Sequence, residues 1–320
     1  MSRPVSSIIK LNLDTALIIG IAAILILPLF QVNPYVLHTI ILSLMFAIMA
    51  AGWSILAVSG SVSLGHAAFF GIGAYFTYFA LTIAGLPSVP ALAVAALASL
   101  IASLLMGYIT FKFGISGIYF ALVTIAFAEI LRELFISLRE ITGGSLGVSL
   151  LFRDFSPMNF IFDSKLPYYY FIAIMFFMIY LIVKYGIKRF LRVLSVIGND
   201  EFTAASMGIN TFRYRMMALA VSSVLNSVVG WFYLHYFRYI TPDAMFGLLT
   251  SVEIVVIGLM GGLNVIGTFF ASLFLIPVGE MLRAALGGTY AGLNILIYGG
   301  LLTLIVLLRS KRIGRGKVSQ

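Results

Sequence analysis

The sequence predicts an all-α bundle of helices that crosses a membrane several times. Of the 320 residues, 62% are hydrophobic and 10% are charged, whereas a soluble domain carries roughly a quarter charged residues. Runs of about 20 apolar residues match the hydrocarbon thickness of a bilayer. Four blocks contain no acidic or basic side chain other than His38: 15–30, 37–58, 90–111 and 291–308. The composition therefore predicts a polytopic membrane protein with a single transmembrane domain over 1–320.

Apolar blocks and the breakers between them predict about ten spans, and eight remain an alternative. We place them at 15–30, 37–58, 66–84, 90–111, 118–138, 167–184, 215–237, 248–260, 265–285 and 290–308. The third and eighth are weak, because the glycine-rich stretches 71–73 and 258–262 favour either short, broken helices or close helix packing. No small-residue cleavage site follows the first apolar run, so we expect the first helix to be retained.

The charged residues predict that both termini are cytoplasmic. Segment 184–215 carries six basic and two acidic residues, a net charge of +4, and 309–320 carries five basic residues and no acidic one. Loop 139–166 is neutral, with three residues of each sign. The positive-inside rule then places loop 139–166 outside the cell membrane. We expect the membrane to be the cell's inner (plasma) membrane. Because the net charge of +9 gathers at span ends, it does not indicate nucleic-acid binding.

The cytoplasmic loop 185–214 is too long for a simple turn, and its pattern predicts short helices. Basic and apolar residues alternate at helical spacing over 189–197. The pattern at 198–200 predicts a turn that ends in an N-capping acid, and 201–207 a short helix that Gly208 closes. This arrangement presents an alanine-containing helix that another protein can approach closely.

Residues 200–210 read DEFTAASMGIN. The segment resembles the E-A-A…G loop of ABC import permeases, in which a coupling helix docks into a groove of the ATPase subunit. The resemblance implies that the ATPase-coupling residues are Asp200, Glu201, Ala204, Ala205, Gly208, Ile209 and Asn210. Phe202 and Thr203 depart from the family pattern, which has smaller residues beside the glutamate.

Three more segments resemble the branch of that family that transports branched-chain amino acids. They are 63–75 (SLGHAAFFGIGAY), 117–132 (GIYFALVTIAFAEILR) followed by 142–147 (TGGSLG), and 257–268 (IGLMGGLNVIGT). All matches follow the family's order between about residues 40 and 285. Asn264 and Val265 depart from it, since the family often has Gly-Ser there.

The resemblance implies the ABC importer permease fold and a transport subunit without catalytic chemistry. Its implied partners are two cytoplasmic ABC ATPase subunits, a second homologous permease, an external substrate-binding protein and the lipid bilayer. We expect no cofactor in this chain, with ATP and Mg²⁺ on the ATPases. The implied cargo is leucine, isoleucine and valine. Urea, short amides or another small polar solute are alternatives, because other family members carry them.

Charged residues inside a span usually face the protein interior and pair with one another. Glu129, Arg132 and Glu133 share one helix face, so they predict a structural ion pair or a position near the translocation path. His66 opens the third span and is expected to be a hydrogen-bonded packing histidine rather than a substrate ligand. No metal-ligand spacing surrounds it.

An ion-coupled secondary transporter is the more distant alternative. Such a carrier would need buried carboxylates distributed over several spans. The intramembrane acids are few: Glu129, Glu133, Glu253 and Glu280. The chain also has no cysteine, which excludes disulfides and thiolate chemistry.

Overall fold

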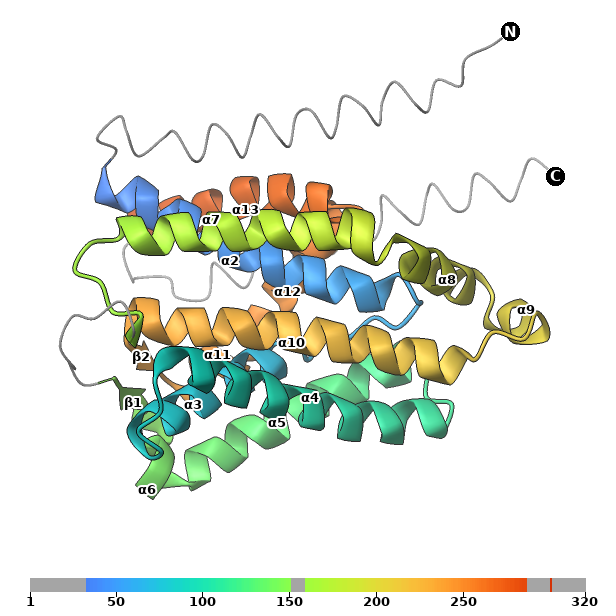
Figure 1. Cartoon of the computed structure of the whole chain (residues 1–320), viewed down its shortest axis with the longest axis horizontal. Coiled ribbons are helices and arrows are strands. Elements are labelled where there is room, and N and C mark those ends of the chain that lie inside the picture. The colour runs from blue at the N-terminus through green and yellow to red at the C-terminus, as the bar shows by residue number, and fades with distance from the viewer. Residues whose placement is uncertain (1–32, 151–158, 287–299, 301–320) are drawn as a thin grey trace, which may run out of the picture.

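The chain forms an elongated bundle of helices that lie roughly side by side (Figure 1). The computed structural model describes residues 33–150, 159–286 and 300, so the expected spans at 15–30 and 290–308 lie outside it. Within the described residues, a helix covers each of the other expected spans. They are α2 (Pro34–Ala57), α3 (Ala67–Thr82), α4 (Ser88–Lys112), α5 (Gly117–Ser137), α7 (Leu166–Leu181), α10 (Thr211–Phe237), α12 (Leu248–Met260) and α13 (Val265–Leu286).

Five helical segments of this described part are long and apolar enough to cross a membrane. Three are single helices, α2, α4 and α10; the others are α7 with the π-helical turn Ile182–Gly186, and the pair formed by α11 (Pro242–Phe246) and α12. Helix α3 is shorter, with 16 residues. The structure thus agrees with an all-α membrane protein, while the total number of spans stays a prediction.

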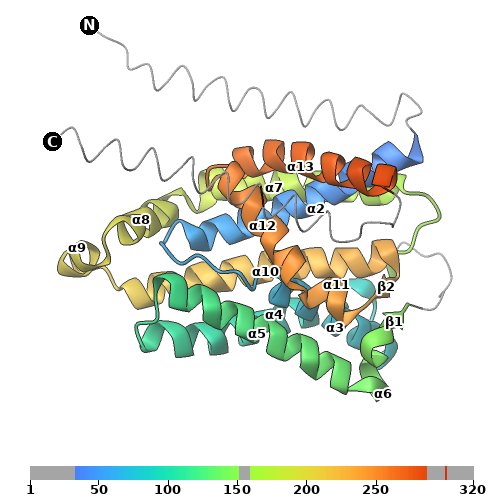
Figure 2. The same ribbon diagram turned by 180° about the vertical axis from the view of Figure 1, so that it is seen from behind.

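Short elements gather at the two ends of the bundle. At one end lie α6 (Arg139–Thr142), the 3-10 turn Gly144–Leu146, and strands β1 (Val148–Ser149) and β2 (Tyr239–Ile240). The strands pair antiparallel, with Val148 opposite Ile240. At the other end α8 (Lys188–Asn199) and α9 (Glu201–Ser206) extend from the bundle (Figures 1 and 2). The two loops that charge assigns to opposite sides of the membrane therefore lie at opposite ends of the molecule.

Helix α2 runs through the interior of the bundle. The Asn33 side chain accepts a hydrogen bond from the Tyr35 amide at 2.9 Å, and Pro34 occupies the first turn, where its missing N–H costs nothing. No acidic, lysine or arginine residue interrupts the helix, and apolar side chains predominate on every face of it, as expected of a helix that is covered on all sides. Helices α7, α10, α12 and α13 pack around it.

The glycines of the third span serve close helix packing. A Cβ on Gly73 would lie 2.3 Å from the Ser227 carbonyl oxygen, and one on Gly230 would lie 2.2 Å from that of Phe70. Helices α3 and α10 therefore touch through their backbones, as small residues permit in membranes. The glycine-rich stretch 71–73 was expected to mark either a short, broken helix or close helix packing. Close packing is confirmed, and 71–73 lies inside the unbroken but short helix α3.

The second glycine-rich stretch both packs and ends a helix. A Cβ on Gly258 would lie 2.4 Å from the Trp53 ring, so α12 lies directly against α2. Helix α12 then ends at Met260, and Gly262, with φ of 69°, turns the chain towards α13.

The connection from α2 to α3, residues 58–66, is irregular and largely buried. Side chains from three helices bond to its backbone or to the amide that follows it. The Trp53 indole donates to the Ser63 carbonyl at 2.7 Å, the Leu64 amide donates to the Thr124 hydroxyl at 3.0 Å, and the Ala67 amide donates to the Ser251 hydroxyl at 3.0 Å. Irregular backbone inside a membrane protein is tolerated where the protein satisfies its polar groups in this way.

Candidate functional site

Helix α8 is the amphipathic first half of the arm formed by α8 and α9. Leu194 and Ile197 are fully buried against the bundle, while Arg189 and Arg192 are exposed. This confirms the helix predicted from the alternation of basic and apolar residues. The expected turn at 198–200 is wrong in its extent, because α8 continues through Asn199 and only Asp200 leaves the helical conformation.

Helix α9 is held by a cap at each end. One Asp200 carboxylate oxygen accepts hydrogen bonds from the amides of Phe202 at 3.0 Å and Thr203 at 3.1 Å, and the other accepts from the Thr203 hydroxyl at 2.5 Å. These bonds stabilise the ionised form and lower the pKa of Asp200. Gly208 ends the segment with φ of 79°. The predicted cap and stop are both confirmed.

The exposed surface formed by α9 and by Met207, which follows it, is apolar and includes a small side chain. Phe202 is 82% exposed and Met207 is 62% exposed, and Ala205 lies beside them at the surface. Ala204 is fully buried, so the expectation that the alanines form the surface is wrong for that residue. The sequence analysis did not single out Phe202 and Met207, although large apolar side chains in a short solvent-facing helix are a usable signal of an exposed apolar surface.

The arm is also tied to the start of α10. The Glu201 carboxylate and the Arg215 guanidinium form an ion pair at 2.7 Å. Asn210 caps α10, with its side-chain oxygen accepting from the Arg213 amide at 2.9 Å, and Ile209 is half-buried. Glu201 and Asn210 therefore hold α9 in place on the bundle in this structure.

The last turn of α8 rests on the irregular segment 58–66. A Cβ on Gly198 would lie 2.2 Å from the Val58 carbonyl oxygen and 3.0 Å from the Gly60 nitrogen. Only a glycine allows this backbone contact. The segment that touches the arm at Gly60 ends at His66, at the beginning of α3.

His66 is a packing residue between α3 and α10. It is completely buried, its Nε2 lies 2.7 Å from the Ser222 hydroxyl, and its ring meets Phe69 edge-on. Among the described residues, neither its Nδ1 nor the Asn226 Oδ1 has a hydrogen-bond partner. The geometry agrees with the packing histidine that we expected.

The charges of α5 converge on Arg132. Its guanidinium contacts Glu129 at 2.6 Å and Glu133 at 2.5 Å on its own helix, and Asp243 on α11 at 2.7 Å. The predicted ion pair is thus confirmed, but sequence reasoning missed Asp243. The side chains of Glu129 and Glu133 are 52% and 59% exposed, so the cluster lies at the surface of the isolated chain.

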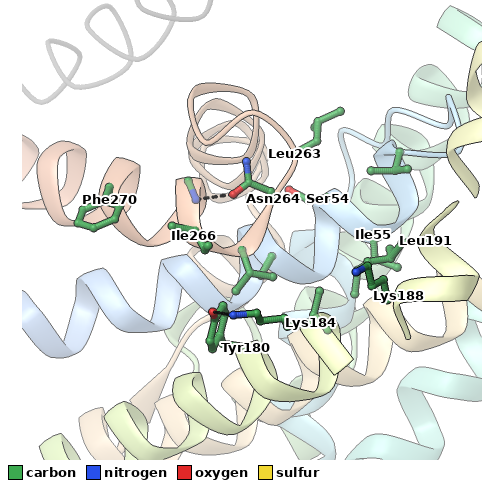
Figure 3. A pocket seen from close by; sticks show the side chains of 15 residues that line it. Ser54, Ile55, Tyr180, Lys184, Lys188, Leu191, Leu263, Asn264, Ile266 and Phe270 are labelled. Atoms are coloured by element: carbon green, nitrogen blue, oxygen red, sulfur yellow. Dashed lines mark hydrogen bonds between the residues drawn. The ribbon is translucent and has the colours of Figure 1, made fainter. Parts of the chain in front are cut away.

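Polar residues line the walls of two of the cavities between the described residues. The inner cavity, of about 530 Å³, lies between α2, α7, α8 and the α12–α13 turn near the arm, and Lys184, Lys188 and Asn264 line it (Figure 3). The outer cavity, of about 270 Å³, is lined by His38, Glu253 and Glu280 among apolar side chains. Within the described ranges, no three His, Asp or Glu side chains are placed to hold a metal ion.

Long apolar helices packed around a buried central helix define a helical membrane protein. Residues 35–308 match the family model for the permease component of branched-chain amino acid transport systems. Because this match covers most of the chain, the protein belongs to that family of transport permeases.

Two curated relatives are similar over most of their length. The high-affinity branched-chain amino acid transport system permease protein LivM of Escherichia coli (strain K12) is 24% identical over 308 residues, covering 88% of this chain and 70% of the relative. The protein of the same name from Salmonella typhimurium (strain LT2) is 24% identical over 296 residues, covering 84% and 67%. No solved structure matches the chain.

Proposed function

We propose that the chain is the membrane-spanning permease subunit of an ATP-driven ABC importer. It carries leucine, isoleucine and valine, which an external binding protein delivers. The observation that supports this most is α9, a helix capped at both ends that presents Phe202 and Met207 beyond the bundle. In this proposal two cytoplasmic ATPases bind ATP and Mg²⁺ and receive α9 in a groove, and a second homologous permease completes the core.

In the proposed mechanism, movement of the ATPases is passed to the bundle through α9. The ion pair of Glu201 with Arg215 connects α9 to α10, and the backbone contact of Gly198 connects α8 to segment 58–66. That segment leads to His66, which bonds to Ser222 on α10. Both connections therefore reach the α3–α10 contact, whose shift would open the path alternately to each side.

The exposed charged residues on α5 support a location for the translocation path beside this helix. Glu129 precedes Ser137, the end of α5, by eight residues, which is about 12 Å of helix. A carboxylate at that depth is unfavourable in hydrocarbon and calls for water or protein beside it. We therefore propose that the face with Glu129, Arg132 and Glu133 borders an aqueous path at the second permease.

The test is uptake of radiolabelled leucine by proteoliposomes that contain the chain with its permease partner, the ATPase pair and the binding protein. We expect ATP-dependent uptake, competed by isoleucine and valine but not by urea or acetamide. Absence of leucine uptake, with ATP-dependent uptake of radiolabelled urea or acetamide, would assign a small polar solute instead. Uptake by the chain alone under an ion gradient would indicate a secondary transporter and overturn the proposal.

A matched pair of substitutions tests the docking role of α9. Phe202→Ala is expected to weaken ATPase binding at least tenfold, because truncation of a central apolar contact residue costs about 2 kcal/mol or more. Phe113→Ala is the control, since Phe113 is 74% exposed at the end of α4 and outside the arm. Equal ATPase affinity of the two variants in a pull-down titration would contradict docking through Phe202.

A further inference from the structure

The inner cavity is a candidate binding site that the transport mechanism does not use. The α7–α8 side of its wall carries Lys184, on the π-helical turn, and Lys188, the first residue of α8 (Figure 3). Such π-helical turns are frequent at functional sites. The opposite wall is the start of α13, with Asn264 and Ile266 (Figure 3).

The polar side of the inner cavity is electropositive. Two lysine ammonium groups and the first turn of the 22-residue helix α13, with its partial positive charge, line the same space. Among the described residues that line it, none is Asp or Glu. The Lys184 ammonium also donates to the Tyr180 hydroxyl at 2.9 Å, which fixes its position at the wall. This combination suits an anion.

Apart from the hydroxyls of Ser54 and Tyr180, the rest of the lining is apolar, so the ligand must have an apolar part as well. The main apolar contributors are Ile55, Val58, Val183, Leu263, Ile266 and Phe270. A branched-chain amino acid would fit the apolar side, but its ammonium group would meet lysines and no carboxylate among the described lining residues. A phosphodiester that carries acyl chains satisfies both halves of the wall. Basic pockets between helices at the cytoplasmic surface bind anionic lipid headgroups in this way.

We propose that the inner cavity binds an anionic phospholipid from the inner leaflet, with its phosphate between Lys184 and Lys188. The glycerol and upper acyl carbons lie against the apolar wall. The cavity joins α7, α8 and α13 to α2, so a lipid held there connects the arm to the interior helix. Lipid binding at this site requires neither cargo nor ATPase. The lipid proposal can therefore be tested independently of the proposed transport function.

The experiment measures lipids retained by the full chain in native mass spectrometry. The protein is purified in mild detergent and titrated with phosphatidylglycerol or phosphatidylcholine of identical acyl chains. Lys184→Gln/Lys188→Gln removes two charges from the cavity wall. The matched control, Arg189→Gln/Arg192→Gln, removes two charges from exposed positions of α8, the helix that carries Lys188, and neither arginine lines the cavity. Lys184→Arg/Lys188→Arg keeps the charge, and circular dichroism verifies that each variant is folded.

We expect the wild type, the arginine-to-glutamine control and the lysine-to-arginine variant to retain phosphatidylglycerol over phosphatidylcholine. The lysine-to-glutamine variant should lose at least tenfold in affinity for phosphatidylglycerol. Equal losses in both glutamine variants would show general charge attraction and overturn the site. Displacement of the lipid by millimolar inorganic phosphate or leucine would show a soluble anion or the cargo as the ligand, and would also overturn the lipid assignment. If the lysine-to-glutamine double variant does not fold, Lys188→Gln alone is measured instead, because Lys188 is exposed. The proposal then requires that this single variant lose affinity for phosphatidylglycerol, and an unchanged affinity would overturn it.

Discussion

Single residues of the arm have separable roles, and Asp200 is the clearest. Its carboxylate caps α9, and hydrogen bonds from Thr203 lower its pKa. A lowered pKa in the folded state means that the cap is fully formed above the ordinary pKa of aspartate. The cap is lost as the pH falls through the lowered value. Near neutral pH, the stability of α9 should therefore be independent of pH.

Removal of this cap should free the first turn of α9. In Asp200→Ala we expect faster amide hydrogen exchange at Phe202 and Thr203 at every pH, whereas wild-type protection fails only in acid. Asp200→Asn is the control, since asparagine caps a helix without titrating. Loss of wild-type protection near pH 7, or full protection in Asp200→Ala, would contradict the role of the cap.

The ion pair between Glu201 and Arg215 should act as one unit in docking. If Glu201 works through its contact with Arg215, then Glu201→Gln and Arg215→Gln each weaken ATPase binding, and the double variant is no weaker than the worse single one. The coupling should be about 1 kcal/mol or less, because the Glu201 side chain is 46% exposed. The affinities of the wild type, the two single variants and the double variant are measured. If the losses of the two single variants simply add up in the double variant, Glu201 and Arg215 contact the ATPase separately.

At the level of elements, one backbone contact connects the arm to the bundle, and a second joins two helices inside the bundle. Helix α8 meets segment 58–66 at Gly198, and α3 meets α10 at Gly73 and Gly230. Close-packed contacts of this kind have little room for intermediate arrangements. A movement of the arm is therefore expected to displace 58–66 as a whole.

A methyl group at Gly198 tests this connection. Gly198→Ala forces α8 away from Val58, at a cost of about 1–3 kcal/mol for overpacking. We expect ATPase binding and hydrolysis to persist while leucine uptake falls about tenfold. Gly186→Ala is the control, because its Cβ would meet only Ile182, at 3.7 Å. Parallel loss of hydrolysis and uptake in Gly198→Ala would show that the contact only holds the arm.

At the scale of the whole molecule, the two ends of the bundle define its orientation in the membrane. The chain has no cysteine, so single cysteines can be introduced without a background. Ser145→Cys lies in the exposed turn beside β1, and Ser206→Cys lies in the exposed α9 at the other end.

An impermeant maleimide added to intact cells should label Ser145→Cys and leave Ser206→Cys unlabelled until the membrane is opened. This follows from the basic loop 185–214 facing the cytoplasm. The reverse pattern would invert the orientation and remove α9 from the reach of any cytoplasmic ATPase. Mass spectrometry of the labelled protein provides the readout.

Features that depend on neighbouring residues can be predicted from the sequence alone. Apolar blocks place the helices of the described part, charge separates the two loops, and local patterns locate α8, the Asp200 cap and the Gly208 stop. These features follow from helix periodicity, bilayer thickness and backbone capping, which act over a few residues or one span.

Contacts between residues far apart in the chain became known from the three-dimensional structure. Arg132 contacts Asp243 more than a hundred residues away, Gly198 contacts Val58, Ala204 faces inwards, and Lys184 shares a cavity with Asn264. Most faces of the spanning helices are apolar, because lipid and protein interior select the same side chains. Hydropathy therefore cannot tell which face packs on which neighbour, and the close backbone approaches between helices settle it.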